Sequence, residues 1–497
     1  MESRVRPEVV RAGWHCPLLF VIASAGCAGL PTCPLPAAAP APAQVAQGSC
    51  PNPDSVACGH PAVAPAEAPA VIPAGEAGPP LGAGGVLSAE SLVEQVLARN
   101  PSLAQMMAAW QAASARYPQV TSLDDPMFAA TVGPETISPD DNGVEFAYRL
   151  EVSQKYPWPG KRQLRGENAL AEARAAGNDV GDMRLQLVES AKSAFYDYYL
   201  VGRALAVNEE TLERLAQFRK DAEALYRTPP KDRKVSFQEV TQADVEIGRQ
   251  QERLLTLERM RQVAVARINT LLHLPPDAPL PPPPQAVTVE DGLPEAAALR
   301  AAALARRPDL LALASRVAAE QAALALAEKE YKPDVEFMAA YDAFWQERPL
   351  RTMLGVRLNL PVRLARRDAA VAEAQARVAQ RQAELARLTD QANFEVQQAY
   401  EQVRESERVV RLYEATILPA AEANVKAAQS AYVTGRIPFL SLVEAQRGVV
   451  GLRDRYYEAV ADYFRRRAAL ERAVGAPLVP QIDKQTPGII SAPGSLP

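Results

Sequence analysis

The sequence predicts a mostly α-helical protein with a small β part, in which the order helix, strand, strand, long helix and return helix occurs twice. Three observations lead to this fold class. Two long stretches contain no proline, several short segments alternate apolar and polar residues, and the body of the chain, at residues 87–478, carries an internal repeat.

The repeat is clearest near the end of each half. A shift of 202 positions, from 237 to 439, places Phe237–Ala243 on Phe439–Ala445, and the helix expected after each segment ends at a proline, Pro275 or Pro477. We therefore expect two repeats joined by a proline-rich linker, since such a stretch cannot continue a helix. The expected boundaries are 87–275 for the first repeat, 276–293 for the linker and 294–478 for the second repeat.

The long helices are indicated by missing helix breakers. No proline occurs between Pro159 and Pro229, and neither proline nor glycine occurs between Pro361 and Pro419. At 1.5 Å per residue the first stretch would reach roughly 100 Å, more than a globular domain requires. Heptad spacing in the second stretch is typical of a coiled coil. Its apolar positions are Leu364, Val371, Val378, Leu385, Ala392 and Ala399, overlapping Val396, Val403, Val410 and Ile417.

The strands are indicated by alternation. Even positions from Val144 to Val152 are apolar and most odd ones are polar, and Leu354 to Leu360 follow the same pattern. Their expected partners are residues 126–133 and 335–342. Four strands cannot close a barrel, whereas three copies of the chain would supply twelve. A sheet with one face buried in a soluble protein is the alternative.

No later segment offers the eighteen or so uninterrupted apolar residues of a membrane helix, so a membrane crossing would need such a barrel. The N-terminus is typical of an export signal, because Arg4, Arg6 and Arg11 precede a short apolar stretch. We expect residues 1–27 to be the signal, with Cys27 in a lipobox-like run as the lipidated residue; ordinary cleavage nearby is the alternative. Residues 28–86, rich in Pro, Ala and Gly, are expected to be a tether, and residues 479–497 a flexible tail.

Composition excludes several functions. All five cysteines lie in the first 58 residues, and the three histidines are far apart, so we expect no disulfide framework, metal site or cofactor. The net charge of -5, without a basic patch interleaved with aromatics, gives no reason to expect a nucleic-acid partner. No catalytic triad or phosphate-binding glycine loop is present, so we do not expect an enzyme.

Two local patterns, taken with the repeat, resemble the TolC-like outer-membrane efflux proteins over essentially residues 87–478. Gln154-Lys-Tyr-Pro-Trp-Pro-Gly-Lys-Arg162 is similar to the strand-to-helix junction of members associated with heavy-metal and related cation efflux. Ala431-Tyr-Val-Thr-Gly-Arg436, followed by Phe439-Leu-Ser-Leu-Val-Glu-Ala-Gln446, is similar to the family's second periplasmic hairpin tip and return helix.

The resemblance implies a homotrimer in the outer membrane of a Gram-negative bacterium. Its twelve-stranded β-barrel would sit in outer-membrane lipid and continue as a helical barrel through the periplasm. The partners implied are a periplasmic adaptor protein and an inner-membrane pump, with the channel as a passive exit for solutes. The motif around Trp158 favours metal cations as those solutes, with drugs, dyes and secreted peptides as alternatives. A lipid-anchored periplasmic coiled-coil adaptor or spacer is the rival interpretation of the whole chain.

The family places acidic or polar side chains at the narrowest aperture of its helical tunnel. Carried over by position, these are Glu239 and Gln242 in the first half and Ser441 and Glu444 in the second. Each pair is three residues apart and therefore shares one helix face. Solvated carboxylates on an outer surface are the alternative.

At the second tip the resemblance assigns Tyr432, Gly435 and Arg436 to the turn, with gating or adaptor contact as the expected role. Ser441 replaces an acidic family residue, and Arg436 stands one position from the family arginine. The first tip, Arg227–Lys234, lacks the compact glycine turn, so its adaptor contact is left open.

Overall fold

The computed structural model describes residues 85–134, 146–228, 236–289, 292–345 and 347–478. The chain divides into two compact units, residues 1–65 and 66–497, and every described residue lies in the second. The predicted signal, Cys27 and the tail 479–497 lie outside the described residues, as does nearly all of the tether.

Six elements form the first half. They are α1 (Ala89–Arg99), α2 (Pro101–Thr121), β1 (Met127–Val132), β2 (Tyr148–Tyr156), α3 (Lys161–Arg227) and α4 (Phe237–Leu271). The second half has the same order. It comprises α5 (Ala296–Arg306), α6 (Pro308–Lys329), β3 (Val335–Asp342), the short 3₁₀ helix η2 (Arg348–Leu350), β4 (Thr352–Leu358), α7 (Leu364–Leu412), the π-helical turn η3 (Tyr413–Ile417), α8 (Leu418–Val433) and α9 (Phe439–Val474). The predicted fold class is confirmed.

Each half begins with two helices where the sequence analysis predicted one. The break falls before Pro101 in the first half and before Pro308 in the second. The preceding residues, Asn100 and Arg307, have extended backbones with ψ of 122° and 120°. A proline ring disfavours the helical conformation of the residue before it, which explains the break. Each proline then occupies the first position of the next helix, where its missing N–H is harmless.

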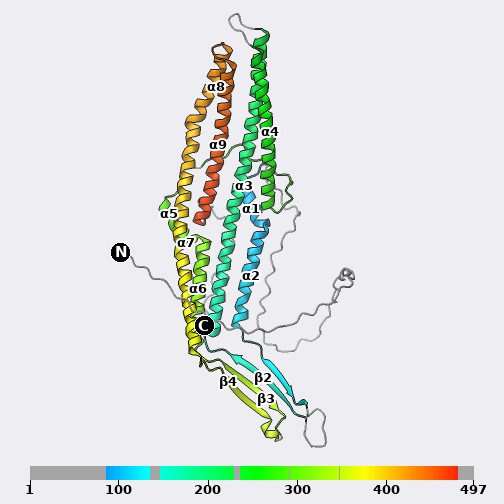
Figure 1. The fold of residues 1–497 in the computed structure, drawn as a ribbon, viewed down its shortest axis with the longest axis vertical. Helices are drawn as coiled ribbons and strands as arrows, with labels where there is room; N and C mark the ends of the chain where they lie inside the picture. The colour runs from blue at the N-terminus through cyan, green and yellow to red at the C-terminus, as the bar shows by residue number, and fades with distance from the viewer. Residues whose placement is uncertain (1–84, 135–145, 229–235, 290–291, 346, 479–497) are drawn as a thin grey trace, which may run out of the picture. The chain divides into compact units, whose positions relative to one another are not determined.

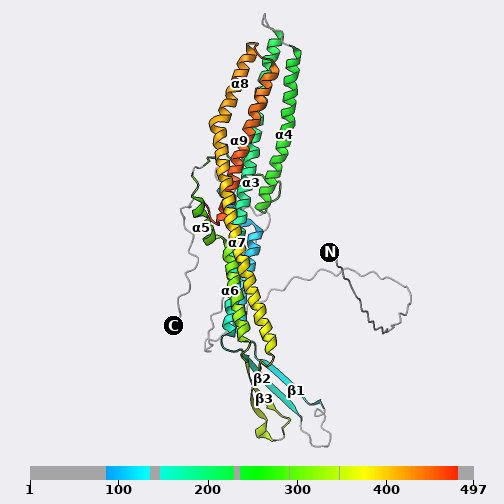
Figure 2. The same cartoon turned by 60° about the vertical axis from the view of Figure 1, so that its left-hand side comes forward.

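The helices run alongside one another, with the sheet beyond the ends at which α3 and α7 begin (Figures 1 and 2). Helix α3 is central, because it packs against α2, α4, α6 and α9. The turn between α8 and α9 lies at the opposite end of the helices from the sheet (Figure 1).

The sheet is antiparallel in the order β1-β2-β3-β4. Its register carries Phe128 onto Val152, Val152 onto Ala339, and Ala339 onto Leu354. Strand β2 starts later than predicted, because its partner β1 ends with Val132 opposite Tyr148. Strand β4 ends at Leu358 opposite Val335, so Leu360 falls outside the ladder. Strands β1 and β4 are the two edges of this sheet.

The two faces of the sheet differ. One face, called here the apolar face, exposes large apolar side chains to the surroundings. Its members include Phe128, Leu150, Val152, Phe337, Leu354, Val356 and Leu358. The other, the polar face, carries ion pairs between Arg149 and Glu151 at 3.0 Å and between Arg357 and Glu336 at 3.0 Å. The predicted alternation is confirmed, and the apolar face lies open within one copy of the chain.

Among the described helices, α6 is long and apolar enough by length and composition to cross a membrane. It packs against α3 and α7, and it buries Leu310, Leu313 and Val317. Its high alanine content, which permits close helix packing, also explains its hydropathy.

Candidate functional site at the helical tips

The tip of the second hairpin is a compact turn. Helix α8 ends at Val433, and Gly435 adopts a left-handed conformation with φ of 74°. The Gly435 N–H donates to the Tyr432 carbonyl at 3.0 Å, and the Arg436 N–H donates to the Ala431 carbonyl at 2.8 Å. This pair of bonds is a Schellman motif, in which a glycine is favoured because a Cβ would be strained. The glycine expected at this turn is therefore explained by backbone geometry.

Apolar side chains of both hairpins meet beneath this turn and form the tip cluster. Its buried members are Leu215, Phe218, Ala222, Val240, Ala243, Tyr432, Phe439, Leu442 and Val443. They come from α3, α4, α8 and α9, so the cluster joins the two halves of one chain. Burial of this kind is the main source of cohesion at the tip.

Tyr432 lies inside the tip cluster. Its side chain is 1% exposed and packs edge-on against Phe439, with ring centroids 5.4 Å apart. Its hydroxyl donates a hydrogen bond to Glu239 Oε2 at 2.8 Å. A residue of the second tip thus holds one predicted aperture carboxylate of the first half. Arg436, in contrast, is exposed.

The four predicted aperture residues all lie in the tip region, but they differ in their exposure to solvent. Glu239 and Gln242 lie near the start of α4 and are partly buried. Ser441 is also partly buried, and Glu444 is exposed. Of the four, Glu444 is the only one classed as exposed among these described residues.

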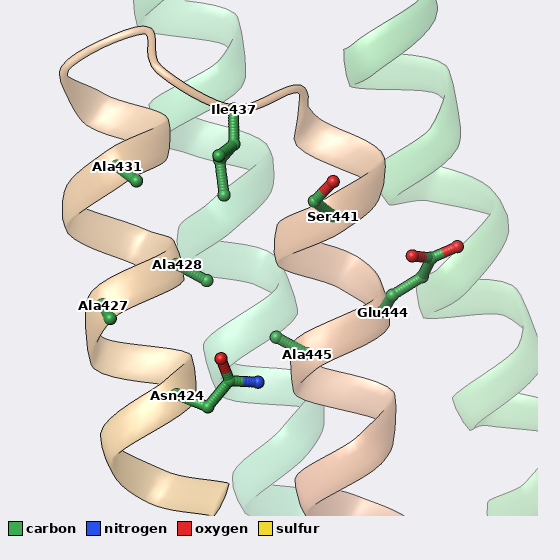
Figure 3. Close-up of a pocket in the computed structure, with 8 residues that line it drawn as sticks. All are labelled: Asn424, Ala427, Ala428, Ala431, Ile437, Ser441, Glu444 and Ala445. Atoms are coloured by element: carbon green, nitrogen blue, oxygen red, sulfur yellow. The ribbon is translucent and has the colours of Figure 1, made fainter.

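Ser441 and Glu444 line a shallow groove of ≈ 550 Å³ between α8 and α9. The other lining residues are Asn424, Ala427, Ala428, Ala431, Ile437 and Ala445. Figure 3 shows Asn424 and Ala445 facing each other between the two helices, whereas the Glu444 side chain extends away from α8. Small alanine side chains leave the groove open, and a carboxylate stands at its rim.

A second carboxylate on α4, that of Glu246, was not predicted from the sequence as a site residue. Glu246 is buried, and both its oxygens bind the Arg447 guanidinium of α9; the bond from Arg447 Nε to Oε2 measures 2.8 Å. Arg249 donates to Glu246 Oε1 at 2.8 Å. The hydrogen bond from Arg447 is the main reason that the pKa of Glu246 lies below its usual range, and Arg249 adds to it against the effect of burial. In the sequence, only the spacing of Glu246 and Arg249, three positions apart, indicates an ion pair at this place.

Further along the same helices, Arg253 of α4 pairs with Asp454 of α9. Polar links thus join α4 to the second hairpin at three levels. Tyr432–Glu239, from α8, lies nearest the turn, and Glu246–Arg447 and Arg253–Asp454, both from α9, follow. Within the described residues, no group of three or more His, Cys, Asp or Glu side chains is placed to hold a metal ion. The chemistry available at the tip is therefore charge presentation and hydrogen bonding.

The described residues form a long helical body with a small antiparallel sheet that has two open edges and one apolar face, an arrangement that suits the class of membrane-channel subunits. The family comparison agrees with this class, because residues 299–476 match the model of the outer membrane efflux protein family. The resemblance to the TolC-like efflux proteins is thereby confirmed. No curated protein sequence matches the chain.

Solved structures with a similar fold include outer-membrane channels. The outer-membrane channel OprN has a TM-score of 0.67 at 20% identity, over 78% of this chain and 90% of that chain. VceC of Vibrio cholerae has a TM-score of 0.65 at 18% identity, over 79% of this chain and 97% of that chain. The open state of MtrE from Neisseria gonorrhoeae has a TM-score of 0.64 at 16% identity, over 80% and 91%. At these identities the likeness establishes the fold.

Proposed function

We propose that three copies of this chain form an outer-membrane channel that serves as the passive exit of an efflux system. The observation that carries the proposal is the open apolar face of the sheet, whose Leu354 side chain is 85% exposed. Such a face is unfavourable in water and favourable in lipid. The family match and the fold support the same function. A coiled-coil spacer would leave the sheet without a purpose.

Closure requires other copies, because lipid offers no hydrogen-bond partners to the backbone of edge strands β1 and β4. Pairing β4 of one copy with β1 of the next would satisfy both edges, and three copies give the expected twelve strands. Strand β2 has nine residues, which is the length a tilted membrane strand needs.

Aromatic side chains flank the apolar face at both ends. Tyr156 and Trp158 lie at the end next to the helices, and Phe344 and Trp345 lie at the far end of β3; all four are exposed. Aromatic residues are enriched at both interfaces of membrane barrels. Their positions support a membrane placement of the sheet.

The assembly is tested with the full chain expressed in a Gram-negative host. We expect the protein in the outer-membrane fraction, extractable only with detergent and migrating as a heat-sensitive trimer. A mature protein that stays soluble and monomeric without detergent would contradict the proposal.

Acylation of Cys27 is tested in the same membranes by metabolic labelling with a palmitate analogue, which Cys27→Ser should abolish.

At the helical end we infer that Glu444, with Glu239, Gln242 and Ser441, contributes to a cation-favouring aperture. The exposure of Glu444 supports this role, since three copies would concentrate negative potential around one axis. Planar-bilayer recordings of Glu444→Gln should show lower cation-over-anion permeability. Glu458→Gln, which removes an exposed carboxylate farther along α9, is the matched control. Unchanged selectivity in Glu444→Gln would count against the aperture.

The adaptor and pump implied by the family resemblance are proposed as partners at this end. The groove between α8 and α9 supports an adaptor contact, because its alanine lining lets another helix approach closely. A photo-crosslinker at Ala427 should capture a co-expressed adaptor, whereas one at Phe394, exposed on α7, should not. Equal capture at both positions would remove the groove from the proposal. Lys231 of the first tip lies outside the described residues.

A further inference from the structure

The motif around Trp158, which favoured metal cations in the sequence analysis, lies at the junction between sheet and helices, at the opposite end from the tips (Figure 1). Strand β2 ends at Tyr156, Gly160 takes a left-handed φ of 87°, and α3 begins at Lys161. A Cβ at Gly160 would also meet Lys329 Nζ, at the end of α6. The segment therefore makes a close turn against the other repeat.

Lys161 is the centre of this junction, and its side chain is only 1% exposed. Its ammonium donates to Asp334 Oδ1 at 3.0 Å, to the Lys332 carbonyl at 3.0 Å and to Glu330 Oε2 at 3.2 Å. All three acceptors lie between α6 and β3 in the second half. Each of the three ammonium hydrogens thus has an acceptor across the junction.

Asp334 completes the connection, because the same Oδ1 atom accepts the Trp158 N–H at 2.9 Å. Burial alone would raise the pKa of Asp334, but the Trp158 N–H and the Lys161 ammonium outweigh it and hold that pKa below its usual range. A buried cation at a helix N-terminus is opposed by the helix dipole. Lys161 is therefore stable there only with these partners.

Two arginines near Lys161 also bind acceptors across the junction, but their side chains are less buried than that of Lys161. Arg162 Nε donates to the Thr121 carbonyl at the end of α2 at 2.9 Å. Arg367 Nε, in the first turn of α7, donates to the Glu330 carbonyl just after α6 at 2.8 Å. Basic side chains at the starts of both long helices thus bind carbonyls at the ends of both short ones. These contacts fix how the strands leave the helices.

We propose that Lys161 and Asp334 form a buried clasp that sets the direction of the sheet, so that edges β1 and β4 can meet those of neighbouring copies. The Tyr156–Lys161 segment is then an assembly element and carries no information about the exported solute. The inference rests on the proposed trimeric channel. The role of this motif is then to position the sheet during assembly, and it does not involve contact with the solute.

The test compares Lys161→Met with Lys155→Met in the full chain. Lys155 also faces Asp334, but at 3.9 Å and with a side chain 52% exposed. We expect Lys161→Met to lower the amount of heat-sensitive trimer in outer membranes roughly tenfold or more, because a buried carboxylate loses its partner. Lys155→Met should leave the trimer unchanged. Adding Asp334→Asn to Lys161→Met should restore much of the trimer, since asparagine still accepts the Trp158 N–H without a charge.

Hydrogen exchange of the Trp158 amide provides a readout that does not depend on assembly. This amide should exchange slowly in the wild type and in Lys155→Met, and fast in Lys161→Met. Equal exchange in all three proteins, or wild-type trimer levels in Lys161→Met, would overturn the clasp while leaving the channel intact. Loss of helicity in Lys161→Met without recovery in the double variant would also overturn it. A wild type with a slowly exchanging Trp158 amide that never trimerises would instead contradict the proposed function.

Discussion

Large apolar side chains are buried at one end of the helices and exposed at the other. At the tip, Tyr432 and Phe439 are each 1% exposed inside a cluster that one chain completes by itself. At the sheet, Leu354 is 85% and Val356 61% exposed, although both lie in a regular strand. A folded chain leaves such a face open when its partner is another molecule or lipid.

The two ends therefore depend on different surroundings. The sheet carries its ion pairs on the face away from the apolar side chains. In the proposed channel, the apolar face would therefore depend on the membrane for its stability. The tip carries its ion pairs between α4 and α9 of the same chain. Changes at the sheet should therefore affect membrane assembly, whereas changes at the tip should affect the stability of the helical end.

The largest effect is expected from Leu354→Arg, which places a charge on the apolar face. A charge near the middle of the membrane costs a barrel ~2–4 kcal/mol, and the trimer would bear it three times. Outer-membrane fractionation should show loss of the inserted trimer. Met353→Arg, one residue away on the polar face near Glu151, is the matched control and should insert. Insertion of both variants would contradict the assignment of the faces.

Phe439→Ala should have the next largest effect. Removing a fully buried phenylalanine costs about 3–5 kcal/mol, through lost burial and the cavity left behind. Chemical unfolding in detergent, followed by circular dichroism, should show this loss. The control is Phe237→Ala, at the equivalent position of the first repeat, where the ring is 57% exposed. Similar losses in both variants would mean that the two repeats do not differ at their tips in this way.

Much of the fold could be predicted from the sequence, because it depends on periodicity. The proline-free stretch after Pro159 predicted a long helix, which is α3 in the structure. The alternation of apolar and polar residues after Val144 predicted the apolar face of the sheet. The π-helical turn Tyr413–Ile417 was not predicted, because no proline or glycine within it marks a change in the helix. The heptad positions also divide: Val396 and Val403 are fully buried, whereas Leu364 is 55% exposed.

The site was less predictable, because its contacts join residues far apart in the chain. The tip residues were located through the family resemblance, yet the bond from Tyr432 to Glu239 spans 193 positions and leaves no local pattern. The same holds for Arg447 and Glu246, and for Lys161 and Asp334. Local spacing identifies a helix face, but only the packing of helices determines which charges meet.

Glu246→Gln should show a smaller effect that depends on pH. The pKa of Glu246 is lowered in the folded protein, chiefly by the hydrogen bond from Arg447, so its stabilisation is present above the ordinary value of 4.5 and is lost as pH falls through the folded pKa. We expect the variant to lose ~1.5–3 kcal/mol at neutral pH. Its difference from the wild type should shrink below pH 4.5 in chemical unfolding curves. Glu252→Gln, an exposed position on the same helix, should show neither change.

The smallest effect is expected from Tyr432→Phe, which keeps the ring in the tip cluster and removes only the hydroxyl that binds Glu239. One such hydrogen bond contributes about 1 kcal/mol, and Glu239 remains accessible enough to be solvated when the bond is lost. Chemical unfolding should detect this difference, while the trimer in the membrane stays as abundant as in the wild type. Tyr226→Phe, at a ring 46% exposed, should leave the free energy of unfolding unchanged. A Tyr432→Phe variant that lost its membrane trimer would show that the tip and the sheet are coupled, against the separation argued from their burial.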